Sequence, residues 1–174
     1  MASDLSGCFF REPEDLYQSP EQSADYLSLT QTIRNVKDSL AQEYGVEVED
    51  VSVMSGDNTA LIQLQDLDRD GERETAVTFF RVSEAEKPLK IYFFTRTAED
   101  TYTVSAMVEG NGTAIYRVDY VDLNGSGCKE VVVSWQMSTG VYLLGAYSLE
   151  EAMVRSLQYA ASAPAGSASA QGLP

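Results

Sequence analysis

The sequence predicts a mainly β protein in which one amphipathic helix precedes two four-stranded antiparallel sheets. Three observations support this prediction. Apolar residues recur at helical spacing in one stretch of the amino-terminal third of the chain. From residue 57 onward the apolar period changes to two, which is typical of strands. The strand pattern then occurs a second time at a fixed distance along the chain.

The charge balance limits the classes of partner. The 174-residue chain is 44% hydrophobic and carries 12 basic against 27 acidic residues, a net charge of −15. This argues against nucleic acid, which needs basic patches, and against electrostatic binding to anionic lipid, and it favours cations. The chain has no histidine, and its two cysteines cannot form a zinc site by themselves. No run of about 18 apolar residues is present to span a membrane.

Residues 1–18 form an irregular lead that holds a candidate lipid attachment site. Its residues 5–8, LSGC, resemble the lipobox of secreted bacterial lipoproteins, in which the cysteine receives the lipid. The resemblance implies a lipid on Cys8 and a membrane contact through that lipid alone. A signal peptide needs a basic stretch and about 7–15 apolar residues before the cleavage site, and only seven residues precede Cys8. A free thiol at Cys8 is the alternative.

A single amphipathic helix is predicted over residues 19–45. Ser19 is the expected N-cap, Pro20 suits the first helical position, and Gln22 completes a capping box. Gly45 is the expected stop. The apolar stripe comprises Leu29, Ile33, Val36, Leu40 and Tyr44. A helix with one such stripe packs against another element, and we expect it on the edge or face of a sheet.

Two units of four strands each are predicted, over residues 57–109 and 114–159. In the first unit the strands are expected at 60–65, 75–80, 89–97 and 101–108. In the second they are expected at 114–121, 131–135, 141–149 and 152–159. Residues 160–174 are almost entirely Ala, Ser, Gly and Pro, and we expect this tail to be disordered.

The two units are in register. Asp66 and Asp122 are 56 residues apart, and the same interval separates Gly71 from Gly127. A fixed period of this size indicates a repeat architecture. A four-stranded antiparallel sheet repeated in this way is the blade of a β-propeller, so we expect two propeller-type blades.

The acidic loop of the first unit, DLDRDGERE, predicts a calcium site. Its alternating oxygen ligands and its later glutamate are Asp66, Asp68, Asp70 and Glu74, at positions 1, 3, 5 and 9. Gly71 permits the tight turn, and the backbone carbonyl of Glu72 adds a further oxygen. Hard oxygen ligands favour calcium over zinc or copper. An EF-hand is excluded because its twelfth position would be Val77, inside a strand.

The loop of the second unit, DLNGSGCKE, is a weaker version of the first. The equivalent ligands are Asp122, Asn124, Ser126 and Glu130, with the backbone carbonyl of Cys128 at position 7. Only two carboxylates remain, so we expect weaker binding than in the first loop. For both loops the alternative is an Asp-, Asn- and Gly-rich turn that binds no ion.

These loops and the strands after them, TAVTFF and VVVSW, resemble FG-GAP or VCBS-type repeats, which integrin α-subunit propellers and bacterial surface lipoproteins carry. The resemblance covers residues 57–159. It departs from the family pattern at Glu74 and Glu130, which replace an aspartate, and at Ser126. A propeller closes with about four to eight blades, and two blades leave strand edges open. We therefore expect a fragment of a longer propeller. The alternatives are that the helix covers one open face, or that two chains complete each other.

The resemblance implies a calcium-stabilised, lipid-anchored binding or scaffold module on the outside of a bacterial cell, with an extracellular protein or a glycan as partner. No catalytic residue is predicted, since Glu84 and Glu86 lie in a polar turn and Asp119 at a strand end. The alternative is a carbohydrate-active enzyme or carbohydrate-binding domain on a propeller scaffold. Trp135 is expected in the core rather than as a sugar platform.

Overall fold

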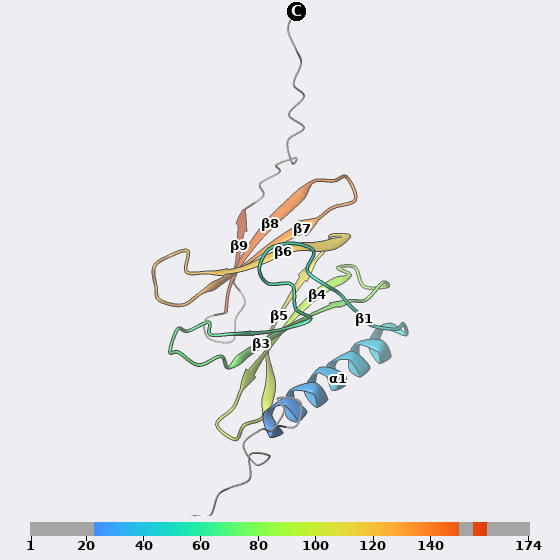
Figure 1. Cartoon of the computed structure of the whole chain (residues 1–174). Coiled ribbons are helices and arrows are strands. Elements are labelled where there is room, and N and C mark those ends of the chain that lie inside the picture. The colour runs from blue at the N-terminus through green and yellow to red at the C-terminus, as the bar shows by residue number, and fades with distance from the viewer. Residues whose placement is uncertain (1–22, 150–154, 160–174) are drawn as a thin grey trace, which may run out of the picture.

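The computed structural model describes residues 23–149, together with the backbone of residues 155–159 (Figure 1). The elements are α1 (Ala24–Tyr44), β1 (Glu49–Asp50), β2 (Ile62–Gln65), β3 (Thr75–Arg81), β4 (Leu89–Arg96), β5 (Tyr102–Gly110), β6 (Ala114–Val121), β7 (Glu130–Gln136), β8 (Tyr142–Ser148) and β9 (Arg155–Tyr159). The predicted lead with Cys8, the tail 160–174 and the first residues of the last strand lie outside the described residues.

The strands form two antiparallel sheets, as predicted, but the first sheet has five strands and not the predicted four, because the short β1 also pairs with β3. The first sheet has the order β1-β3-β4-β5, and β2 also pairs with β3. The second sheet has the order β6-β7-β8-β9. A mainly β fold with one helix is therefore confirmed, and the two sheets do not close into a barrel.

The helix begins later than predicted. Ser23 has an extended backbone (φ −68°, ψ 145°), and its side chain accepts a hydrogen bond from the Tyr26 amide at 3.2 Å. Ser23 is therefore the N-cap and Ala24 the first helical residue, whereas the predicted cap, Ser19, lies outside the described residues. Gly45 ends the helix as predicted, at φ 68° with its amide bonded to the Ala41 carbonyl at 2.9 Å.

The apolar stripe of α1 covers one face of the first sheet. Towards its start the helix packs through Leu29, and towards its end through Leu40, both buried. Their partners in the sheet and the following turn are Ala76, Phe80, Val82, Ala85, Phe94 and Tyr102. The predicted position of the helix on a sheet face is thus confirmed.

The main core lies between the two sheets. β3 alternates, so that Val77 and Phe79 face the second sheet while Ala76 and Phe80 face the helix. Because both faces are covered, six of the seven β3 residues are buried. The second sheet contributes Ile115, Val118, Val131, Val133 and Trp135 to this core. Trp135 is 5% exposed, which confirms its predicted core position.

The segment between β1 and β2 joins the sheets, which the sequence did not indicate. The Val51 amide donates to the Phe79 carbonyl in β3 at 2.9 Å. The Met54 and Ser55 amides then donate to carbonyls of β6, at 3.1 and 2.8 Å. The segment therefore covers the open edge of β6. The first sheet also includes β1. It therefore begins before residue 57, where the first unit was predicted to start.

Candidate metal centre

Both acidic loops lie at the same end of the stacked sheets. The first connects β2 to β3 and the second connects β6 to β7, so each is flanked by antiparallel strands and not by helices (Figure 1). Leu67, in the first loop, is 9% exposed, and its carbonyl oxygen accepts a hydrogen bond from the Lys129 amide of the second loop at 2.7 Å. The two candidate sites are therefore neighbours on one rim.

The first loop brings three carboxylates together. One oxygen each of Asp66, Asp68 and Asp70 lies within 4.8 Å of the others. Gly71, the next residue, adopts φ 100°, which favours glycine and turns the chain back toward β3. The predicted convergence of alternate side chains is thus present at these three residues.

Hydrogen bonds within the loop hold the carboxylates inward. The Asp66 Oδ2 accepts from the Gly71 amide at 3.0 Å, and the Asp68 Oδ1 accepts from the Asp70 amide at 3.1 Å. The other oxygen of Asp66, Oδ1, is buried and has no hydrogen-bond partner among the described residues. A buried carboxylate oxygen without a partner is costly, and a bound cation would compensate it. The residues of the first loop therefore fit a metal ion.

The two glutamates of the first loop differ. The pKa of Glu74 is raised above its ordinary value. Burial is the largest cause, followed by the negative charges of Asp68 and Asp70 and a hydrogen bond with Asp68. Its carboxyl group is thus close enough to feel Asp68 and Asp70, but Glu74 is not part of the cluster that the three aspartates form. The Glu72 side chain instead accepts a hydrogen bond from Arg96 Nη2 at 2.9 Å. This leaves its backbone carbonyl for the ion, which is the role predicted for Glu72.

The second loop repeats this local geometry. The Asp122 Oδ2 accepts from the Gly127 amide at 3.0 Å, and the Asn124 Oδ1 accepts from the Ser126 amide at 2.8 Å. Gly127 adopts φ 97°. The Asp122 Oδ1 is also buried without a hydrogen-bond partner among the described residues. The second loop differs from the first in ligand chemistry more than in conformation.

Glu130 closes the second loop. It is 2% exposed, and its Oε2 accepts a hydrogen bond from the Leu123 amide at 2.7 Å. One of the two carboxylate oxygens of this predicted ligand is thus already bonded to the loop. Cys128 is a free, half-buried thiol whose amide donates to Ser126 Oγ at 3.3 Å. Its predicted contribution, the backbone carbonyl, does not involve that thiol.

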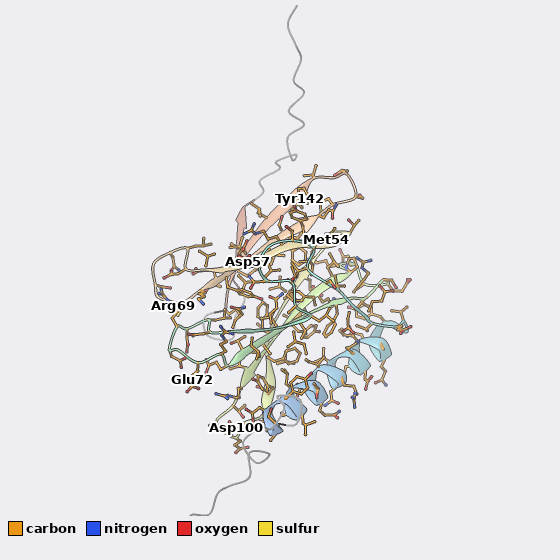
Figure 2. All side chains as sticks on the ribbon, viewed as in Figure 1. Met54, Asp57, Arg69, Glu72, Asp100 and Tyr142 are labelled. Carbon is orange, nitrogen blue, oxygen red and sulfur yellow. The ribbon has the colours of Figure 1, made fainter. Side chains whose placement is uncertain are left out.

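Arg69 is a residue at this rim that the sequence analysis missed. Its Nη1 lies 3.6 Å from the Asp122 Oδ2, so the guanidinium of a first-loop residue reaches the first predicted ligand of the second loop. Figure 2 labels Arg69 in the first loop. Arg69 adopts φ 63°, which is uncommon for a residue with a side chain. The sequence carries no signal for this contact because it joins residues that are far apart along the chain.

The acids weighed for catalysis differ in their surroundings. Both carboxylate oxygens of Asp119 accept hydrogen bonds from Arg117, at 2.6 and 3.1 Å. Glu84 and Glu86 are exposed.

Comparison with known proteins yields no relative. The chain matches no protein-family model, no curated protein and no solved structure. In the described residues, no helix has the length and apolar character needed to cross a membrane.

Proposed function

We propose that the protein is a calcium-stabilised binding or scaffold module of the FG-GAP/VCBS type, whose two sheets act as propeller-type blades. One observation supports it most strongly. Asp66 and Asp122, the first residues of the two loops, each accept a hydrogen bond at 3.0 Å from the glycine five positions later. Each also keeps its other carboxylate oxygen buried without a hydrogen-bond partner in the described chain. A turn that binds no ion would gain nothing from a buried carboxylate oxygen without a partner, yet both loops have one.

Calcium suits these ligands better than other common metals. In the first loop Asp66, Asp68, Asp70 and Glu74 would hold the ion, with the Glu72 carbonyl. In the second loop Asp122, Asn124, Ser126 and Glu130 would hold it, with the Cys128 carbonyl. All of these atoms are oxygens, which calcium prefers and which zinc and copper do not. The ion would replace repulsion between the carboxylates by attraction and so stabilise the folded loop.

An extracytoplasmic position completes the proposal. The second loop, with only two carboxylates, suits the high calcium of extracellular surroundings, where binding at about 10⁻⁴–10⁻³ M is sufficient. A lipid on Cys8 would hold the module at a bacterial membrane surface. The proposed partner is an extracellular protein or a glycan, bound by the sheets that calcium stabilises.

A carbohydrate-binding domain is the second candidate. Tyr116 and Tyr142 are half-buried neighbours, with ring centroids 4.6 Å apart. Adjacent aromatic rings offer apolar faces to a sugar while their hydroxyls reach its polar groups. Retention on immobilised polysaccharides that Tyr142→Ala abolishes would favour this function. A parent protein that no polysaccharide retains would count against it.

Calcium-dependent melting tests the main proposal. At an ion concentration of 100 times Kd, binding adds about 2.7 kcal/mol to the free energy of unfolding. For a domain of this size this raises Tm by roughly 5–10 °C over the value in chelator. Asp68→Ala should remove most of that increase, and Asn124→Ala should remove a smaller part.

Glu84→Ala is the matched control, because it also deletes an exposed acidic or polar side chain but lies outside both loops. Its calcium response should equal that of the parent. A parent that melts at the same temperature in calcium and in chelator would contradict the proposal.

A further inference from the structure

A cleft lies beside the first acidic loop, at the end of the core between the two sheets. It has a larger part of about 420 Å³ and a smaller part of about 170 Å³, and both parts are lined by Leu67, Asp68 and Leu149. The larger part reaches Thr75 and Thr95 of the first sheet, and the smaller part reaches Lys129 of the second loop. Small-molecule sites typically have volumes of about 300–1,000 Å³, so the cleft is large enough for such a ligand.

Two threonine hydroxyls in the cleft have no hydrogen-bond partner among the described residues. Thr75 and Thr95 lie opposite each other on β3 and β4, and both belong to the sheet face that carries the core residues Val77 and Phe93. Thr75 is 6% exposed, and its hydroxyl is not closed to solvent, so a molecule in the cleft can reach it. A hydroxyl this deeply placed is costly unless a group in the cleft bonds to it.

The charged groups of the cleft favour a neutral ligand that both donates and accepts hydrogen bonds. They are the carboxylates of Asp68 and Glu74 and the ammonium group of Lys129, which forms no ion pair within the described chain. An anion would meet two carboxylates on a chain of net charge −15, and a cation would meet Lys129. A ligand hydroxyl suits all of these groups, because it donates to a carboxylate and accepts from an ammonium or a threonine hydroxyl.

We propose that this cleft binds one neutral sugar residue of a glycan. Hydroxyls of the sugar ring bond to Thr75, Thr95 and the Asp68 carboxylate, and the C–H groups of the ring contact Leu67 and Leu149. A carboxylate has two oxygens, so that of Asp68 can bond to the sugar and also hold the proposed ion. The inference rests on the proposed function in one respect, because it takes the glycan as the partner.

NMR titration of the full chain with three neutral hexosides tests the proposal. The probes are methyl α-D-glucoside, methyl β-D-galactoside and methyl α-D-mannoside, and at least one of them should shift the amide resonances of Leu67 and Leu149 saturably. Thr75→Val keeps a side chain of similar shape and removes the hydroxyl, so it should weaken binding roughly three- to tenfold. Thr95→Val should act in the same direction. Thr103→Val is the matched control, because the exposed Thr103 lies opposite Thr95 on β5 and does not line the cleft.

The outcomes separate the possible ligands and sites. Saturable shifts that weaken in Thr75→Val and Thr95→Val and persist in Thr103→Val support the proposal. Binding that Tyr142→Ala abolishes and Thr75→Val leaves unchanged places the sugar at the tyrosine pair and overturns it. Shifts caused by ethylammonium and by none of the hexosides show a cation site and overturn it as well, as does a cleft that responds to no probe.

The calcium-dependent rise in Tm separates this inference from the proposed function. Thr75 is not a proposed ligand of the ion, so Thr75→Val should keep that rise. A parent that shows the rise and binds no hexoside counts against the cleft alone. Hexoside binding without the rise supports the cleft and counts against the calcium sites. Circular dichroism of each variant verifies that the fold is retained.

Discussion

The carbonyl oxygen of Leu67 accepts a hydrogen bond from the Lys129 amide at 2.7 Å and thereby joins the two acidic loops. Each end of this bond lies inside a candidate ion site, between residues that we propose as ligands. A change in the conformation of one loop therefore acts directly on the backbone of the other. The Arg69–Asp122 ion pair, at 3.6 Å, is a second link between the same two loops.

The Arg69 guanidinium should weaken calcium binding in the second loop. Arg69→Gln removes a positive charge next to Asp122 and keeps a side chain of similar length. Because ion pairs at exposed positions contribute less than about 1 kcal/mol, we expect the affinity of the second loop to rise by no more than roughly fivefold. Calorimetric titration in an Asp68→Ala background, with the first loop impaired, measures this affinity.

Arg73→Gln is the control for this prediction, since Arg73 is an exposed arginine of the same loop with no ion pair in the described part of the chain. An equal increase in affinity for both variants would show that only the net charge matters, and not the contact with Asp122.

The raised pKa of Glu74 predicts a pH dependence. In the calcium-free protein the folded state holds the Glu74 proton more tightly than the unfolded state does, because of burial and of Asp68 and Asp70. Stability in chelator should therefore fall as the pH rises from the ordinary glutamate pKa through the raised one. Calcium needs the ionised carboxylate, so its affinity should fall as the pH is lowered through the same interval.

Melting curves in chelator across this pH range measure the effect, and Glu74→Gln should flatten the curve. Glu84→Gln, at an exposed position outside the loop, should leave it unchanged. A parent whose stability in chelator rises across this interval would give the opposite sign and contradict the assignment to Glu74.

A buried hydrogen bond between the sheets should contribute to stability. The Tyr120 hydroxyl donates to the Gln63 Oε1 at 2.6 Å, and Gln63 is 4% exposed. Burial raises the pKa of Tyr120, so its hydroxyl keeps its proton at neutral pH. Tyr120→Phe leaves the Gln63 oxygen unsatisfied and should lower the free energy of unfolding by about 1–3 kcal/mol.

Urea unfolding measures this loss. Tyr116→Phe removes the hydroxyl of a half-buried tyrosine in the same strand, for which the described residues supply no hydrogen bond, and it should change the stability little. Equal losses in the two variants would mean that the bond to Gln63 is not the cause.

Gly110 should be essential for the packing of the two sheets. A Cβ atom at this position would lie 2.4 Å from Cε3 of the Trp135 ring, which is too close for any contact. Gly110→Ala should therefore destabilise the protein by about 1–3 kcal/mol and shift the fluorescence of Trp135, the single tryptophan.

The double variant Gly110→Ala/Trp135→Phe tests the cause, because the smaller ring makes room for the methyl group. It should lose less stability than the two single changes added together. Full additivity would mean that the ring is not what Gly110 accommodates.

Local features of the chain were predictable from the sequence. Strand positions follow from alternation of apolar residues, and the strands around both acidic loops lie within a few residues of their predicted bounds. The turn of the first loop was also accessible, because the hydrogen bonds accepted by Asp66, Asp68 and Asp70, such as that from Gly71 to Asp66, join residues no more than five positions apart. The identity of the ion and the biological partner stay predictions.

The start of the helix was only partly accessible. Ser19 and Ser23 are both suitable caps by local chemistry, and Pro20 favoured the first. In the structure the first turns of α1 are fixed by β5, where the Tyr102 amide donates to Ser28 Oγ at 3.1 Å and Thr32 Oγ1 donates to the Tyr102 carbonyl at 3.1 Å. Contacts of this kind, across some seventy positions of sequence, leave no trace in a local pattern.

The sequence by itself determined two sheets and two oxygen-rich turns, because alternation and ligand spacing act over a few residues. Only the tertiary structure decided that these turns touch through Leu67 and Lys129, that Arg69 reaches Asp122, and that a cleft opens beside the first loop. The physical reason is that packing and cross-sheet hydrogen bonds depend on the stagger of the two sheets, which no stretch of either sheet encodes alone.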